Sequence, residues 1–133
     1  MPPPLAASTS LPLDADGALV TDACLRAPAD ARVFGAGDCI AFAGSALPRV
    51  GVYAVRQAPV LAANLAAALD GRPLRRFRPQ RRTLLIVSCG DGTGLALWGG
   101  LWWHGRLAAA WKARLDRRWL GRLRAAASAP AAP

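Results

Sequence analysis

The sequence predicts an α/β fold, with short strands and one helix before residue 70 and a β-hairpin and a second helix after it. The chain has 133 residues, of which 53% are hydrophobic, so it is long enough to build the core of one modest domain. Apolar residues recur at helical spacing in 51–69 and again in 106–123. Elsewhere, short apolar runs alternate with Gly, Asp and Pro, which is typical of strands joined by turns.

The first expected elements are two short strands, Leu11–Leu13 and Ala18–Val20, on either side of the turn Asp14–Gly17. Glycine suits the end of this turn because it adopts positive φ without strain. Together these segments predict a hairpin. Next, Arg32–Asp38 is expected to be a brief buried strand that runs into a glycine-flanked acid.

The best-defined helix spans Gly51–Leu69, and its polar positions include Arg56, Gln57 and Asn64. Pro59 lacks the amide proton that a helix interior uses and costs about 3 kcal/mol there, so we expect either a kink or a late start. The apolar positions that recur at helical spacing are Val52, Val55, Pro59, Ala62, Leu65, Ala66 and Leu69.

Charge divides the chain near residue 70. Residues 1–70 hold four Arg and six Asp, a net charge of −2, whereas residues 71–133 hold thirteen Arg or Lys and two Asp, a net charge of +11. The basic half begins with Gly71–Arg82, which we expect to be an extended connector because its two prolines oppose a helix. The arginines of this connector are expected to be solvated.

The rest of the basic half is expected to form a hairpin and a helix. Thr83–Cys89 and Thr93–Trp98 are the two strands, and Arg106–Leu123 is the helix. The Ala/Pro-rich tail, residues 125–133, is expected to be disordered. The helix carries an apolar residue at every fourth position, namely Leu107, Trp111, Leu115, Trp119 and Leu123.

Composition argues against several classes of function. The three cysteines, Cys24, Cys39 and Cys89, are odd in number and lack CxxC spacing, which disfavours a disulfide framework, a zinc site or a redox dithiol and suggests a reducing compartment. His104 is the only histidine, so a metal site or histidine-dependent nucleophilic catalysis would lack partners. The segment after Met1 has neither the basic nor the apolar region of a signal peptide.

One apolar stretch, Leu84–Trp103, imitates a membrane-spanning helix. It contains a single charge, Asp91, and approaches the roughly 20 residues that such a helix needs. Its glycines, which include Gly90 and Gly92, are typical of turns and would expose backbone groups to lipid. We therefore expect a hairpin in this stretch.

The candidate site lies within residues 33–69. Gly35 and Gly37 have no Cβ and let a ligand approach the backbone, and the Asp38 carboxylate can accept hydrogen bonds from ligand hydroxyl groups. A loop then leads to a helix that begins near Gly51, whose free amides and positive dipole end stabilise an anion. The pattern predicts a ligand site at the carboxyl end of a strand.

These residues also carry a resemblance. Asp16–Arg26 and Val33–Cys39 resemble, in order and spacing, the second flavin motif of the pyridine nucleotide-disulfide oxidoreductases. Pro48–Leu65 is similar to the branch of that family related to type II NADH dehydrogenases, in particular to the modules found joined to selenide, water dikinase. The connector Gly71–Arg82 and the segment Trp111–Arg118 also resemble that branch, so the likeness extends over most of the chain.

The resemblance implies an FAD-dependent oxidoreductase that passes electrons from NAD(P)H to an acceptor, with quinone as one candidate. It implies that Asp38 binds the ribityl hydroxyls of FAD and that Gly37 allows the close approach. The backbone at Gly51, Val52 and Tyr53 would meet the flavin ring. Type II NADH dehydrogenases usually have Ala-Gln where this chain has Val52-Tyr53, so the acceptor does not follow from the resemblance.

The resemblance also implies a partial FAD/NAD(P)-binding Rossmann-like domain. Members of the family begin with a GxGxxG turn that holds the FAD pyrophosphate, and no such motif occurs here. We therefore expect a truncated product that, on its own, binds FAD weakly or not at all and is not active. Residues 1–70 would be the carboxy-terminal part of the FAD domain, 71–124 the connector, hairpin and amphipathic helix, and 125–133 the tail.

A second hypothesis rests on the last helix alone. Trp111 and Trp119 lie on its apolar stripe among many arginines, which suits an anionic membrane surface. The alternative is that both tryptophans pack on the sheet while the arginines face water. No specific nucleic-acid binding is expected, because the basic charge comes without a recognition motif. The expected location is cytoplasmic, with attachment to the inner face of the membrane under the second hypothesis.

Overall fold

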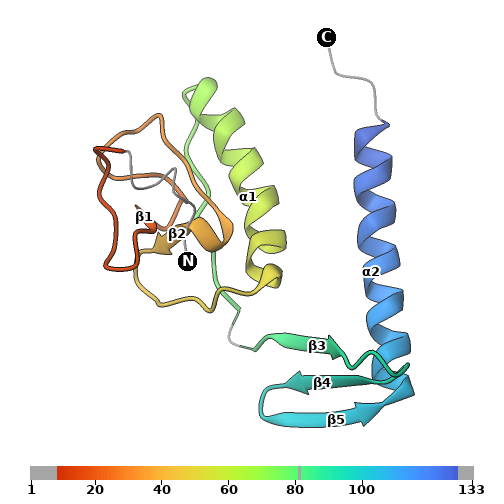
Figure 1. The fold of residues 1–133 in the computed structure, drawn as a ribbon. Helices are drawn as coiled ribbons and strands as arrows, with labels where there is room; N and C mark the ends of the chain where they lie inside the picture. Colours follow the sequence, from red (N-terminus) through yellow and green to blue (C-terminus); the bar gives the residue numbers. More distant parts are fainter. Residues whose placement is uncertain (1–8, 81, 129–133) are drawn as a thin grey trace. The chain divides into compact units, whose positions relative to one another are not determined.

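The computed structural model describes residues 9–80 and 82–128. Within them the chain is a mixed α/β protein with a two-stranded sheet, a three-stranded sheet and two α-helices, which confirms the predicted class (Figure 1). The chain forms two compact units, the first ending at Pro79 and the second beginning at Gln80.

Unit 1 contains a small parallel sheet. Strand β1, Leu19–Thr21, pairs with β2, Ile40–Phe42, so that Val20 lies opposite Ala41. The expected turn before β1 is present, with Gly17 at a φ of 78°. The first arm of the expected hairpin makes only one antiparallel bridge, between Leu13 and Leu19. The backbone before the turn runs alongside β1 over a short stretch only.

The expected strand Arg32–Asp38 is wrong. Only Phe34 makes a bridge, to Arg26, and the strand of this region is β2, which begins after the acid rather than before it. Gly37–Cys39 form a single 3-10 turn between the two segments, with Gly37 at a φ of 79° that a continuing strand cannot adopt. Gly37 therefore interrupts the expected strand, and Asp38 lies before the amino end of β2 rather than at the carboxyl end of a strand as predicted.

Helix α1 spans Gly51–Leu69, as the sequence predicts, and Pro59 lies inside it without delaying its start. Its buried face, however, differs from the apolar stripe of the sequence. Tyr53, Gln57, Asn64 and Ala67 are the buried residues. The apolar positions Val55, Leu65 and Leu69 are exposed.

Two buried amide side chains explain this orientation. Asn64 donates to the carbonyl oxygens of Cys24 and Arg75, at 2.7 and 2.9 Å, and accepts from the Arg75 amide at 2.7 Å. Gln57 accepts from the amide of Gly37. By length and composition alone α1 is apolar enough to cross a membrane, but these buried amides are typical of the core helix of a folded unit.

Residues 71–79, most of the expected connector, belong to unit 1, which ends at Pro79. Phe77 is buried, its amide bonds the carbonyl oxygen of Ala23, and its ring meets Phe42 edge-on at 5.7 Å. Burial of this aromatic ring draws the extended segment onto the core. The arginines of the connector that the structure describes are exposed, as expected.

Unit 2 contains a three-stranded antiparallel sheet. Strand β3, Leu84–Ser88, pairs with β4, Gly94–Trp98, which confirms the predicted hairpin and excludes a helical span in this stretch. Strand β5, Leu101–Gly105, pairs with the other edge of β4 and was not predicted. The Gly99-Gly100 turn, in which both residues have positive φ, joins β4 to β5.

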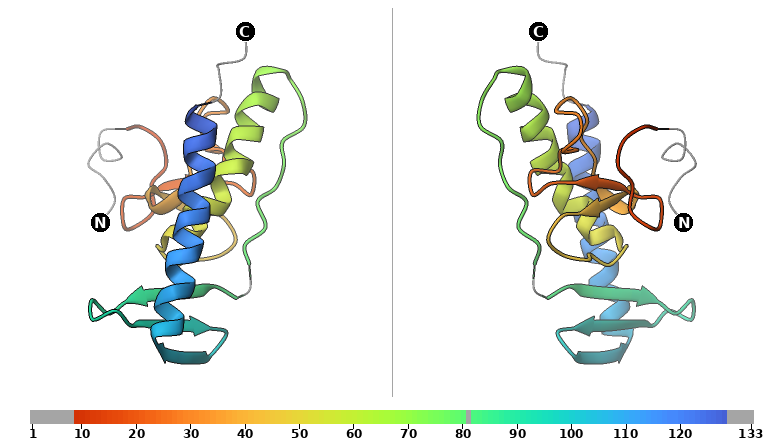
Figure 2. Two further views of the ribbon diagram at one scale, coloured as in Figure 1. Left: turned by 90° about the vertical axis from the view of Figure 1, so that its right-hand side faces the viewer. Right: turned by 90° about the vertical axis from the view of Figure 1, so that its left-hand side faces the viewer.

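Helix α2, Arg106–Ala127, packs on this sheet by its amino-terminal end (Figures 1 and 2). Ala108 is fully buried there, and Trp111 stacks on Trp103 with ring centroids 5.6 Å apart. The helix continues to Ala127, into the segment expected to be disordered, because alanine has the highest helix propensity. The remainder of that expected tail, residues 129–133, lies outside the described residues.

Candidate functional site

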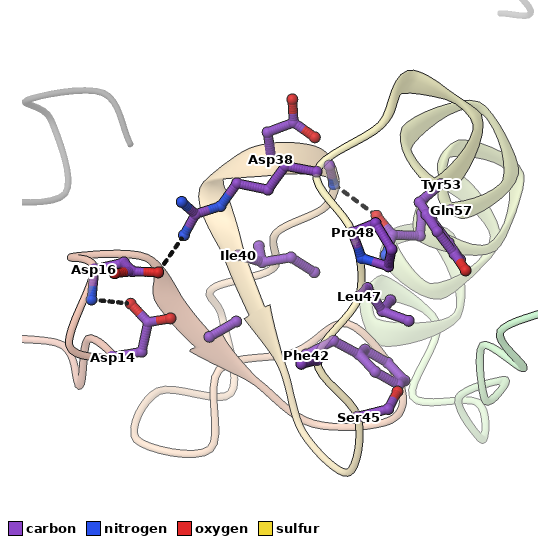
Figure 3. Close-up of a pocket in the computed structure, with 14 residues that line it drawn as sticks. Asp14, Asp16, Asp38, Ile40, Phe42, Ser45, Leu47, Pro48, Tyr53 and Gln57 are labelled. Atoms are coloured by element: carbon purple, nitrogen blue, oxygen red, sulfur yellow. Dashed lines mark hydrogen bonds and ion pairs between the residues drawn. The ribbon is translucent and has the colours of Figure 1, made fainter. Parts of the chain in front are cut away.

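A cavity of about 490 Å³ opens in unit 1 between the 3-10 turn, β2 and the start of α1 (Figure 3). Apolar side chains from β2 and from the loop after it line one part, and acidic and amide side chains line the rest. The lining residues are Asp14, Asp16, Gly37, Asp38, Ile40, Ala41, Phe42, Ser45, Ala46, Leu47, Pro48, Arg49, Tyr53 and Gln57.

The 3-10 turn is fixed against α1 by one hydrogen bond. The Gly37 amide donates to Oε1 of Gln57 at 2.6 Å, and Gln57 is only 1% exposed. A Cβ built on Gly37 would lie 3.4 Å from the Cβ of Ala54, so the turn also packs closely on the helix. The positive φ of Gly37 and the buried amide together set where the next residue projects.

That next residue is Asp38, which lies at the rim of the cavity. Figure 3 shows its carboxylate pointing away from Ile40 and Phe42. The side chain is exposed, and no other described residue forms a hydrogen bond or an ion pair with it. A carboxylate without such partners keeps its full capacity to accept hydrogen bonds from a ligand.

The turn before β1 forms another part of the rim. Asp14 accepts hydrogen bonds from the amides of Asp16 and Ala18, at 3.0 and 2.7 Å, which fixes the turn. Arg49 donates from Nη2 to Oδ2 of Asp16 at 3.3 Å and so links this turn to the loop before α1. Both side chains of the pair are partly exposed, and the pair therefore adds little to stability.

The start of α1 faces this region with its first turn uncapped. Val50 precedes the helix and supplies no side-chain cap, so the amides of Gly51 and Val52 have no acceptor within the helix. Tyr53, in the same turn, is 7% exposed and lines the cavity. The positive end of the helix dipole favours an anionic or electron-rich group here.

The structure brings three of the five predicted site residues together. Gly37, Asp38 and Tyr53 line the cavity, whereas Gly51 and Val52 belong to the adjoining helix start without lining it.

Sequence reasoning missed Gln57, Asp16 and Arg49. Gln57 has a signal in hindsight, because it follows Tyr53 by four residues and so lies on the same face of the helix. The pair of Asp16 and Arg49 joins positions 33 apart in the chain and has no local signal.

Three carboxylates and one guanidinium surround the cavity, which favours a ligand rich in hydroxyl groups over a phosphate. Ile40, Phe42 and Leu47 offer an apolar surface that a planar ring can cover. No protein-family model matches this chain, and no curated protein sequence matches it significantly.

Proposed function

We propose that unit 1 is the flavin-contact part of an FAD-dependent oxidoreductase that takes electrons from NAD(P)H, as the resemblance to the pyridine nucleotide-disulfide oxidoreductases implies. The observation that carries the proposal is the Asp38 carboxylate, which has no partner among the described residues and projects beside the positive-φ turn at Gly37, at a cavity bounded by the start of α1.

The residues around the cavity fit the flavin ring and the ribityl chain of FAD. Asp38 would accept hydrogen bonds from the ribityl hydroxyls, and the positive φ of Gly37 sets the direction in which Asp38 projects. Tyr53 and the amides of Gly51 and Val52 would lie along the ring. Gln57 would act as a positioning residue, because its hydrogen bond to Gly37 holds the turn against α1.

The same residues do not fit the FAD pyrophosphate. Asp14, Asp16 and Asp38 repel phosphate, and only Arg49 among the lining residues would attract it. We therefore propose that residues outside unit 1 bind the pyrophosphate and the nucleotide.

Two surfaces of unit 1 support the proposal that residues outside it bind the pyrophosphate and the nucleotide. The parallel sheet has only two strands, whereas parallel sheets are typically larger and covered on both faces. The outer face of α1 presents Val55, Leu65 and Leu69 to solvent, with Leu69 90% exposed. A dinucleotide-binding half, in the same gene product or in another chain, would extend the sheet and cover this face.

The bound flavin would supply the electron transfer, and the chain would bind and orient it. The helix dipole of α1 would stabilise the negative charge that a flavin ring gains on reduction.

The test is to express the product of the longest reading frame that contains this chain and to record its visible absorption. The proposal predicts a yellow protein whose flavin, released by denaturation, is FAD. NADH or NADPH should bleach the bound flavin in the absence of oxygen. A colourless product that takes up no added FAD would overturn the proposal.

A further inference from the structure

Helix α2 extends far beyond the sheet on which it packs. Its contacts with the sheet are made near Ala108, Ala109 and Trp111, and the part after Trp111 continues to Ala127, a length of roughly 24 Å at the rise per residue of an α-helix. Figure 1 also shows α2 projecting away from β3, β4 and β5. Within unit 2, contacts with the sheet therefore hold α2 at its amino-terminal end only.

The projecting part carries an uncovered apolar face. Leu115, Trp119 and Leu123 follow Trp111 at four-residue steps, and Leu120 adjoins them. All four are between 39% and 46% exposed. Large apolar side chains gathered in this way along a helix mark a surface that another body covers.

The charge on α2 points to the nature of that body. The helix has seven basic residues and one acid, a net charge of +6, and its acid, Asp116, pairs with Lys112. Relative to Trp119, helical geometry places Arg118 about 100° to one side and Arg124 about 140° to the other. Arginines thus border both sides of the apolar face.

A second copy of α2 fits this surface poorly, because two helices of charge +6 would repel each other across the contact. Nucleic acid would pair with arginines but would leave Leu115 and Leu123 exposed to water. A layer of anionic headgroups over acyl chains satisfies both features at once, and tryptophan favours that boundary.

We propose that α2, from Trp111 onward, lies on an anionic membrane surface. Leu115, Trp119 and Leu123 enter the boundary between headgroups and acyl chains, and the flanking arginines meet lipid phosphates. This proposal concerns unit 2 and stands apart from the flavin proposal for unit 1, so each can fail without the other.

The test is flotation of the full chain with vesicles, half phosphatidylglycerol and half phosphatidylcholine, compared with vesicles of phosphatidylcholine alone. We expect partition into the anionic vesicles only, weakening as salt is added. Replacing Arg118, Arg122 and Arg124 by Gln should lower the partition coefficient by about 100-fold, at about fivefold for each cation.

A pair of tryptophan variants measures the contribution of the apolar contact to vesicle binding separately from the contribution of charge. Trp119→Ala should lower the partition coefficient by about tenfold. Trp102→Ala is the matched control, because Trp102 lies on β5 and is 70% exposed, and it should leave partition unchanged. Circular dichroism should show the same helix content in all variants.

Each of the following results would overturn the proposal. The first is no partition into anionic vesicles at low salt, or equal partition of Trp119→Ala and the wild type. The second is a concentration-dependent dimer that Trp119→Ala abolishes, without vesicle binding. The third is binding to duplex DNA that survives Trp119→Ala, again without vesicle binding.

Discussion

Single residues fix the geometry of unit 1 where the chain has no regular structure. At Gly35, a Cβ would lie 2.6 Å from Cγ2 of Ile40, so only glycine lets this segment approach β2. Asp22 holds the neighbouring turn by accepting hydrogen bonds from the amides of Cys24 and Arg26, at 2.8 and 2.9 Å. Within that turn Leu25 has a φ of 63°, an uncommon conformation for leucine, and its side chain is fully buried.

Thr21 provides a prediction in which a core substitution raises the free energy of unfolding instead of lowering it. Its side chain is fully buried, and its hydroxyl has no hydrogen-bond partner within the described residues. Thr21→Val keeps the shape and removes a desolvated hydroxyl, so it should stabilise unit 1 by about 1 kcal/mol. Slower native-state hydrogen exchange of the Ala43 amide, which bonds the Thr21 carbonyl, would measure this gain.

Thr93→Val is the matched control for that substitution. The Thr93 hydroxyl lies 2.5 Å from Oδ1 of Asp91 and 2.9 Å from Nε2 of His104, so its loss should weaken unit 2 slightly. Faster exchange in Thr21→Val would show that the hydroxyl contributes to folding.

Asp30 provides a prediction about pH. Hydrogen bonds from the Arg32 side chain, and next from the Arg32 amide, lower the pKa of the Asp30 carboxyl from 3.8 to about 2. Because the pKa is lower in the folded state, the contribution of this pair is complete above pH 3.8 and is lost as pH falls through about 2. An NMR titration of the Asp30 carboxyl should therefore give a pKa near 2.

The Arg32→Gln variant should raise that pKa toward 3.8. Arg72→Gln, which removes the partner of Asp70 instead, is the control and should leave the Asp30 titration unchanged. A pKa that Arg32→Gln does not move would contradict the assigned cause.

At the scale of elements, helix α1 illustrates both the reach and the limit of sequence reasoning. Its bounds were predictable because an alanine-rich segment continues until Asp70-Gly71, where glycine ends the helix. Its buried face was not predictable from apolar spacing. Gln57 and Asn64 turn inward because backbone groups remote in sequence meet them, and periodicity carries no information about such partners.

The sheet of unit 2 was predicted only in part for a different reason. β3 and β4 follow from apolar runs on either side of a glycine-rich turn. β5 has the same kind of signal in Gly99-Gly100, which is a two-residue hairpin turn, but its tryptophans resemble a continuation of the apolar run.

The candidate site was also predictable only in part. Gly37, Asp38 and Tyr53 could be identified from local patterns and family resemblance, whereas Arg49 reaches the cavity through the folded loop before α1.

The contact between β4 and α2 gives a prediction about the stability of unit 2. A Cβ on Gly94 would lie 2.9 Å from the backbone nitrogen of Ala109, and backbone cannot easily give way. Gly94→Ala should therefore destabilise unit 2 by about 1–3 kcal/mol. Urea unfolding followed by tryptophan fluorescence measures it, because all five tryptophans lie in unit 2.

Gly121→Ala, the same type of substitution within helix α2, is the control. Its added Cβ would meet nothing within 4 Å, so the substitution should stabilise α2 by about 0.5–1 kcal/mol. Equal stability of Gly94→Ala and the wild type would mean that α2 does not pack closely on β4.

At the scale of the whole molecule, the two units differ in charge and in the surfaces they leave open. Residues 80–133 hold nine Arg or Lys and two Asp, a net charge of +7, whereas residues 1–79 hold eight Arg and six Asp, a net charge of +2. Unit 1 exposes the outer face of α1, and unit 2 exposes the projecting part of α2. We interpret the first surface as a contact with a dinucleotide-binding half and the second as a contact with a membrane.

The central claim is that Asp38 contacts a flavin, and the affinity for FAD tests it most directly. In the product of the longest reading frame containing this chain, Asp38→Ala should weaken FAD binding by about 10- to 100-fold, because a hydrogen bond to a charged group contributes about 1.5–3 kcal/mol. Asp30→Ala removes a partly exposed carboxylate that does not line the cavity and should leave the affinity unchanged. Equal affinity in the two variants, or no binding of FAD at all, would contradict the account.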